Sequence, residues 1–210
     1  MTGVKIREMR SLSERYVKAP FFIGGVAFAV FALVLGTWSY AKGPAGWFLS
    51  GSGAKDYSIG LDKNVKHKGK ASGFLRSKST WKRGFGTMMQ IILADRFRGK
   101  RVRLSGWLKT QDVRQWAGMW MRVDGKKGKI LAFDNMQRRF LRGTLAWKSY
   151  DIVLDVPKNA SRIAFGVLLS GPGRVWVDAL KMEKVSLKVP TTVKPRIILP
   201  KVPQNLNFEK

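Results

Sequence analysis

The stretch Arg101–Thr110, RVRLSGWLKT, decides the class of fold that the sequence predicts. Apolar Val102 and Leu104 alternate there with the charged residues Arg101 and Arg103. Side chains two positions apart in a β-strand lie on the same face of a sheet, so this alternation is typical of a strand with one face buried and one face in water. The stretch therefore predicts a β-strand.

Segments of the same kind flank this strand in both directions. Upstream lie YSIGL, KASGFLRS and GFGTMMQIIL; downstream lie WAGMWMRVDGKKGK, WKSYDIVLDVP, RIAFGVLLSG and GRVWVDALKMEKV. Turn residues separate several of them, as at Asp124–Gly125, Pro157–Asn159 and Gly171–Gly173. About eight short strands without a long helical period predict a mainly β domain over residues 57–187, an antiparallel β-sandwich of the jelly-roll type.

These strands also carry a family resemblance. FRGKRVRLSGWLKT, followed by YDIVLDVPKNASRIAFGVLLSGPGRVWVDALKMEKV, resembles the galactose-binding-like jelly rolls of many carbohydrate-binding modules. FDNMQ (Phe133–Gln137), FGVLLSG and the closing NLNFE resemble more narrowly an uncharacterised bacterial domain of this architecture, which also occurs in proteins labelled as regulators. The resemblance covers about Tyr57 to Glu209. It implies the fold, whereas sugar-binding, protein-binding and structural domains all share that fold.

The N-terminal region contains an uncharged stretch, Phe21–Tyr40, FFIGGVAFAVFALVLGTWSY, after a basic segment at residues 1–19. As a helix it would span about 30 Å, the thickness of a bilayer core. A signal peptide cleaved near Ser39–Ala41 is the alternative. The length of the stretch and the flanking aromatic residues Trp38, Tyr40 and Trp47 favour a retained transmembrane helix over residues 20–41.

Small residues fall on one side of this predicted helix. Gly25, Ala29, Ala32 and Gly36 follow one another at steps of three and four, which places them on a common face. Helices in lipid associate through close packing of such residues, so the four predict a helix-packing face. Chance alignment of residues that are common in membrane helices is the alternative.

The charges beside the predicted helix suggest its orientation. Residues 1–20 carry five Lys and Arg, whereas residues 41–60 carry two. The positive-inside rule then favours an N-terminus in the cytoplasm and a β domain outside a bacterial inner membrane. The alternative is a β domain on the cytoplasmic side, which its high positive charge would also suit. A Gly- and Ser-containing stretch at 42–56 predicts a flexible linker, and prolines at 190, 195, 200 and 203 predict an extended tail over 188–210.

Candidate catalytic and metal-binding residues are few. The sequence has no cysteine and one histidine, His67, in a polar basic turn, so thiol nucleophiles and His-rich metal sites are not expected. The carboxylates are scattered along the chain. Because relatives of this fold often hold a structural calcium ion, the resemblance makes Asp178 and Glu183 candidate ligands. We predict no enzyme activity and no cofactor.

A glycan platform is one candidate binding site. Trp116 and Trp120 lie four residues apart in RQWAGMWMR and share a strand face with Arg122, whereas Met119 and Met121 lie on the other face. The tryptophans could stack on a sugar. The alternative, which we favour from the sequence alone, is that the tryptophan face is itself the core.

The strong positive charge predicts an acidic partner. The formal net charge is +27 and the isoelectric point about 11, as expected for a nucleic-acid-binding protein. The sequence nevertheless contains no recognised helix-turn-helix, zinc-finger or RNP pattern, which disfavours nucleic acid. The predicted basic docking surface comprises Arg96, Arg98, Lys100, Arg101, Lys126, Lys127, Lys129, Arg138, Arg139 and Arg142.

Three functions are compatible with these patterns. The leading prediction is a non-catalytic, single-span accessory subunit of a larger membrane complex, such as a photosynthetic or respiratory one. Its partners would be other membrane-protein subunits and anionic lipid headgroups. The alternative is a membrane-anchored glycan-binding module. The third is a nucleic-acid-binding or regulatory domain.

Overall fold

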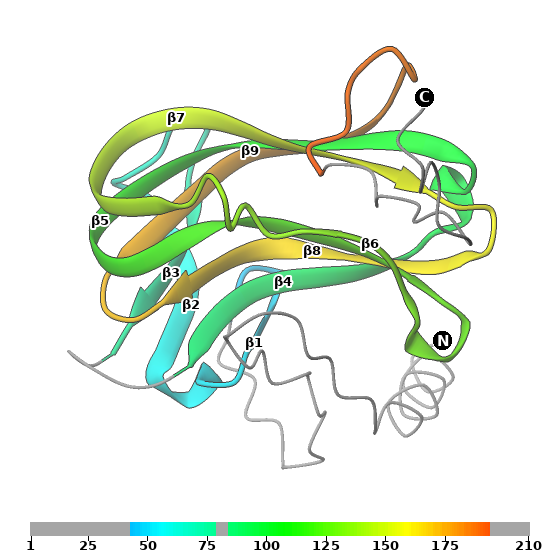
Figure 1. Cartoon of the computed structure of the whole chain (residues 1–210). Coiled ribbons are helices and arrows are strands. Elements are labelled where there is room, and N and C mark those ends of the chain that lie inside the picture. Colours follow the sequence, from blue (N-terminus) through cyan, green and yellow to red (C-terminus); the bar gives the residue numbers. More distant parts are fainter. Residues whose placement is uncertain (1–42, 79–83, 194–210) are drawn as a thin grey trace, which may run out of the picture.

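The computed structural model describes residues 43–78 and 84–193, which form a mainly β, antiparallel sandwich (Figure 1). Three short 3₁₀ helices join some of the strands: η1 at Ala54–Asp56, η2 at Asp95–Phe97 and η3 at Lys126–Gly128. The strands are β1 Phe48–Ser50, β2 Tyr57–Asp62, β3 Ser72–Ser77, β4 Phe85–Leu93, β5 Lys100–Gly125, β6 Ile130–Asp134, β7 Leu141–Val156, β8 Ala160–Ser170 and β9 Arg174–Val185.

The long strand β5 belongs to both layers of the sandwich. Its first half pairs with β7 and β9, and its second half pairs with β8 and β6. One layer therefore has the order β2-β3-β9-β5-β7, here called the β9 layer, and the other has the order β1-β4-β8-β5-β6, here called the β8 layer. In Figure 1 β7 and β9 lie in the upper layer and β4, β6 and β8 in the lower one.

The hydrophobic core lies between the two layers and receives side chains from both halves of β5. Val102, Leu104 and Leu108 enter it from the β9 layer, and Met119 and Met121 enter it from the β8 layer. All five are at most 1% exposed. The alternation in the sequence thus predicted the buried face of the first half of β5.

The sandwich is larger at both ends than the predicted domain 57–187. β1 pairs with β4 and lies within 42–56, where the sequence predicted a flexible linker. Three residues among glycines and serines are too few to show a strand period. At the other end, Thr192 donates its backbone N–H to the Val153 carbonyl oxygen, so the start of the predicted tail lies against β7.

None of the described residues forms a helix that is long and apolar enough to cross a membrane. The predicted transmembrane helix at 20–41, the basic segment 1–19 and most of the predicted tail lie outside the described ranges. The four residues of the predicted helix-packing face lie there as well: Gly25, Ala29, Ala32 and Gly36.

Candidate functional site

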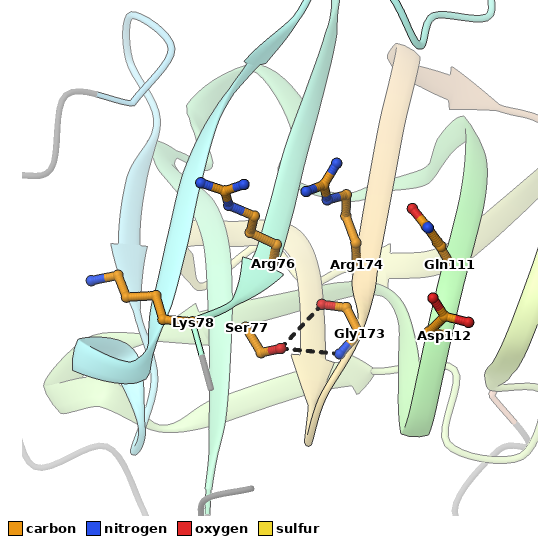
Figure 2. Close-up of a pocket in the computed structure, with 7 residues that line it drawn as sticks. All are labelled: Arg76, Ser77, Lys78, Gln111, Asp112, Gly173 and Arg174. Atoms are coloured by element: carbon orange, nitrogen blue, oxygen red, sulfur yellow. Dashed lines mark hydrogen bonds between the residues drawn. The ribbon is translucent and has the colours of Figure 1, made fainter. Parts of the chain in front are cut away.

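An open pocket of about 460 Å³ lies on the outer side of the β9 layer, where β3 ends and β9 begins (Figure 2). Three of its lining residues are cations and one is a carboxylate. The lining residues are Arg76, Ser77, Lys78, Gln111, Asp112, Gly173 and Arg174. The pocket therefore combines excess positive charge with both hydrogen-bond donors and acceptors.

The sheet register places three of these side chains in one row. Arg76 of β3 lies directly opposite Arg174 of β9, and Arg174 lies directly opposite Gln111 of β5. Directly paired residues of antiparallel strands point to the same face, with Cβ atoms about 5 Å apart. Figure 2 shows Arg76 and Arg174 side by side on adjacent strands, with Gln111 on the next.

Aromatic rings support both guanidinium groups. The Arg76 Cζ atom lies 5.5 Å from the centre of the Phe74 ring, and the Arg174 Cζ atom lies 5.8 Å from the same centre. Arg174 also lies over Trp176, at 5.1 Å. Cation–π contacts at this range are attractive, so the rings fix the two arginines at the rim of the pocket.

The protein supplies few hydrogen-bond acceptors to the three cations of the pocket. The Arg76 Nε atom donates to the Ser58 hydroxyl at 3.1 Å, and the Lys78 Nζ atom donates to the Lys55 carbonyl at 3.1 Å. Among the described residues, no carboxylate lies within ion-pair distance of Arg76, Lys78 or Arg174. The three positive charges are therefore available to a ligand.

The backbone around the pocket is constrained. Ser77 and Gly173 are tied by three hydrogen bonds, from the Ser77 N–H at 3.0 Å, from the Gly173 N–H at 3.1 Å and from the Ser77 hydroxyl at 3.4 Å. Gly173 has a φ of +132°, and a Cβ atom there would lie 2.7 Å from the Val113 Cα. Only glycine fits this position.

Asp112 lies where β5 passes from one layer to the other. It is a non-glycine residue with a positive φ, +51°. The Thr144 hydroxyl accepts the Asp112 backbone N–H at 3.0 Å and donates to the carboxylate at 3.3 Å. Asp and Asn tolerate this backbone conformation better than most residues. The result is a carboxylate held across the pocket from the arginines.

Asp62 is a second ordered carboxylate on this outer face. The Val65 backbone N–H and the Trp176 indole each donate to it at 2.9 Å. These two bonds, with a smaller contribution from the positive charge of Arg174, hold the pKa of Asp62 below its ordinary value. Asp62 thus anchors Trp176, which is 2% exposed, beneath Arg174.

The loop between β2 and β3 lies over the same layer, beyond the pocket. The His67 ring stacks on Trp107, with ring centres 3.8 Å apart, and its centre lies 5.9 Å from that of Trp147. The Asp178 carboxylate accepts the backbone N–H groups of His67 and Lys68 at 2.8 and 2.9 Å. His67, expected in a solvated turn, is exposed but ordered by this stacking.

The two calcium candidates both have protein partners. Asp178 holds the β2–β3 loop, and Glu183 pairs with Lys181 at 2.6 Å. Hydrogen bonding from Lys181 is the main cause that lowers the pKa of Glu183. In the described part of the chain, no three His, Cys, Asp or Glu residues are grouped so that they could hold a metal ion.

The predicted glycan platform lies on the other layer. Trp120 is 6% exposed and donates its indole N–H to the Thr87 hydroxyl at 2.7 Å. Trp116 is half-buried, and Arg122 forms an ion pair with Asp124 at 2.9 Å. Trp116, Trp120 and Arg122 lie on the outer face of the β8 layer, where the two tryptophans belong to a second apolar cluster with Met89, Ala164, Leu168, Phe48 and Phe85. The face that we favoured as the core is therefore the outer one, because Met119 and Met121 lie in the main core.

The predicted basic docking surface does not form one continuous surface. Arg101 binds both Asp155 carboxylate oxygens, Arg139 pairs with Asp134, and Arg98 pairs with Asp95 and with the Ala160 carbonyl. The charges of these three arginines are therefore paired within the domain. The remaining seven are exposed and spread over separate turns and strand ends: Arg96, Lys100, Lys126, Lys127, Lys129, Arg138 and Arg142.

The pocket could not be predicted from the sequence, because its charged residues are dispersed along the chain. Arg76 and Arg174 lie in strands that are far apart in the sequence, and Arg174 has no basic neighbour. Both segments were predicted as strands, but the pairing of β3 with β9 was not visible from the sequence. Only that register brings the two arginines together.

Comparison with known proteins gives one similar curated sequence. No family model matches the chain. An "Uncharacterized HTH-type transcriptional regulator YbfP" of Bacillus subtilis (strain 168) is 48% identical over 168 residues, which make up 79% of this chain and 57% of the relative. The chain thus spans a little over half the length of that relative.

Similar solved structures are β-rich domains. The enzymatically active domain of bacteriophage CBA120 tailspike protein 4 has a TM-score of 0.53 at 16% identity, covering 67% of this chain and 20% of that one. The C-terminal family 22 carbohydrate-binding module of Clostridium thermocellum Xyn10B has a TM-score of 0.49 at 13% identity. The match covers 67% of this chain and 86% of that module. The CBM22-1 xylan-binding domain of Paenibacillus barcinonensis Xyn10C also has a TM-score of 0.49, at 15% identity. That match covers 69% of this chain and 89% of the domain.

These likenesses concern the fold alone. The sequence relative, however, overturns the leading functional prediction. A chain 48% identical to a protein named as a transcriptional regulator is not explained as an accessory subunit of a photosynthetic or respiratory complex. The uncharged N-terminal stretch and the high net charge had favoured that prediction, although neither feature is specific to such a subunit.

Proposed function

We propose that the β-sandwich is a non-catalytic binding module for a saccharide, and that the pocket at the ends of β3 and β9 is its binding site. The observation that carries this proposal is the row formed by Arg76, Arg174 and Gln111, with Asp112 beside it. A strand-borne row is a rigid platform, and ligand sites consist of a few polar groups placed on such a scaffold.

The mixture of donors and acceptors favours a saccharide over a simple inorganic anion. The arginines and Lys78 only donate hydrogen bonds, whereas the Asp112 carboxylate accepts them and the Gln111 amide does both. Sugar hydroxyls need partners of both kinds. Phe74, half-buried beneath the two guanidiniums, adds an apolar surface. Sugar-binding domains are among the galactose-binding-like jelly rolls that the sequence resembles, although that fold is not specific to them.

The pocket fits binding better than hydrolysis. Glycosidases generally use a pair of carboxyl groups about 5–9.5 Å apart on either side of the scissile bond. Asp112 is the single carboxylate among the lining residues. A ligand would therefore be held without a general acid opposite a nucleophile or base.

The similarity to a protein named as a transcriptional regulator supports a regulatory role for saccharide binding. The described residues contain strands and short 3₁₀ helices but no helix-turn-helix. We therefore assign the sandwich to ligand sensing rather than to DNA contact. The predicted helix at 20–41 would tether this module to a membrane, with the sandwich outside.

A glycan array with the full-length chain, followed by titration calorimetry, tests the proposal. We expect Gln111→Ala and Asp112→Ala to weaken saccharide binding at least about tenfold, because each removes polar contacts at the pocket. The control is Asp95→Ala, in η2 and not among the lining residues, which should bind like wild type. An array without any bound saccharide, or unchanged binding by both pocket variants, would reject the site.

A further inference from the structure

We infer that the saccharide is acidic, with a sugar carboxylate held between Arg76 and Arg174 and beside Lys78. This inference rests on the proposed function and specifies its ligand class as uronic-acid-containing saccharides.

The unusual feature is the direct pairing of two arginines across neighbouring strands. Like charges directly opposite each other in a sheet destabilise it. Arginine stays charged in proteins, so Arg76 and Arg174 cannot relieve this repulsion by losing a proton. A negative charge placed between them removes it. The register thus favours an anion at this position.

Carboxylates partner some of the other arginines in the described part, but not all of them. Five lie within ion-pair distance of an Asp or Glu: Arg98, Arg101, Arg103, Arg122 and Arg139. The domain therefore supplies carboxylates to several of its strand arginines, whereas it supplies none to Arg76 or Arg174 within the same described ranges.

The two guanidiniums keep most of their donors free. Arg76 uses its Nε atom for Ser58, which leaves both terminal nitrogens, and no described group accepts a hydrogen bond from Arg174. Stacking over Phe74 and Trp176 orients the planar groups while their edges stay open. The planar fork of arginine matches a carboxylate, to which it can donate two parallel hydrogen bonds.

Asp112 restricts which anions fit. Its carboxylate lines the same pocket and repels a small ion that carries negative charge on every side. A ligand with one acidic group and several hydroxyls avoids this repulsion, because the acid can face the arginines while hydroxyls donate to Asp112. A uronic acid within a saccharide has this distribution of charge.

The first experiment separates the inference from the proposed function. A glycan array with acidic and neutral saccharides is probed with the full-length chain, and titration calorimetry then compares trigalacturonate with its methyl ester. We expect the acid to bind at least about tenfold more tightly than the ester, and the difference to shrink as salt rises from about 10 mM to about 1 M.

Other results of the array and the calorimetry would reject the acidic ligand, the carboxylate or the saccharide site itself. Equal binding of acid and ester, or an array with neutral saccharides alone, overturns the acidic ligand and leaves the saccharide site intact. Binding of sulfated or phosphorylated saccharides without uronic acids overturns the carboxylate assignment. An array with no bound saccharide overturns both proposals.

Substitutions test the residues themselves. We expect Arg76→Gln and Arg174→Gln each to weaken binding of the acid about tenfold while binding of the ester changes little. The control is Arg138→Gln, an exposed arginine in the turn before β7, which should bind like wild type. Thermal unfolding of each variant verifies the fold. Wild-type affinity for the acid in both pocket variants would refute the inference.

Discussion

The outer faces of the two layers use their large side chains in different ways, although β5 runs through both. On the β8 layer, Trp120 is buried and bonded to Thr87, and Arg122 is paired with Asp124. On the β9 layer, Arg76 and Arg174 face each other, and no carboxylate of the described residues lies within ion-pair distance of either. Trp120 is therefore packed within its layer, whereas Arg76 and Arg174 keep hydrogen-bond donors that a ligand could use.

Trp120→Ala provides the strongest test of this difference. Removing a buried tryptophan and its bond to Thr87 should lower the free energy of unfolding by about 3–5 kcal/mol, from a typical total of about 5–15 kcal/mol. Denaturant unfolding of the full-length chain measures this. The control is Leu93→Ala on the same outer face, 65% exposed and expected to change stability by at most about 0.5 kcal/mol. An unchanged unfolding midpoint for Trp120→Ala would make the tryptophan face a candidate ligand surface again.

Gly166→Ala tests the tight contact beneath Trp120. Gly166 lies opposite both Trp120 and Met89, and a Cβ atom there would overlap the Met88 carbonyl oxygen and lie 2.8 Å from the Met89 Cα. We expect a loss of about 1–3 kcal/mol in the free energy of unfolding, because β4 and β8 must separate to admit the methyl group. Denaturant unfolding again measures it. A variant as stable as wild type would show that β4 and β8 can admit the methyl group without a loss of packing.

Asp62→Asn tests whether the β9 layer also contains structural polar groups. Because the pKa of Asp62 is lowered in the fold, its carboxylate stabilises the protein above the ordinary aspartate pKa of about 3.9, and this contribution disappears as the pH falls through the folded pKa. We expect Asp62→Asn to cost about 1 kcal/mol at pH about 7.

The pH dependence distinguishes this mechanism from a general loss of packing. The difference in stability between wild type and Asp62→Asn should shrink as the pH falls towards about 2, where the wild-type carboxyl is protonated as well. Thermal unfolding at both pH values measures it. A difference that stays constant with pH would assign the effect to something other than the charged carboxylate.

Arg76→Gln should have the smallest effect on stability, with the opposite sign. Removing one of two facing like charges should leave the free energy of unfolding unchanged or raise it by up to about 1 kcal/mol. Arg101→Gln is the matched control, because it breaks the two-bond contact with Asp155 and should lower stability. Thermal unfolding at low salt compares them. Destabilisation by Arg76→Gln comparable to that of Arg101→Gln would show that Arg76 serves the fold.

The sequence predicted the sandwich well, because alternation is a local property. It separated Met119 and Met121 from Trp116 and Trp120 by face, as the structure has them. It favoured the tryptophan face as the inner one, whereas Met119 and Met121 lie in the main core; the pattern misled because both faces are apolar. It also treated the two halves of β5 as separate strands, since nothing local indicates that the chain stays extended through Asp112 with a positive φ.

The proposed binding site was harder to predict from the sequence, because it depends on pairing between distant strands. Runs of basic residues had drawn attention to Arg101 and Arg139, which pair with Asp155 and Asp134. Arg174 follows a glycine and a proline in a turn and has no basic neighbour. Charge density along a chain is therefore a weaker guide to a site than charge that remains unpaired after folding.

The passage of β5 through both layers has a consequence for engineering. A protein designer who wants to transplant the arginine pocket into another scaffold must supply Gln111 and Asp112 as well as β3 and β9, and these residues lie midway along a strand that continues to Gly125. Cutting β5 after the pocket would remove the central partner of β8 and the partner of β6. The pocket can therefore be transplanted only together with the whole sandwich, because β5 pairs with strands of both layers.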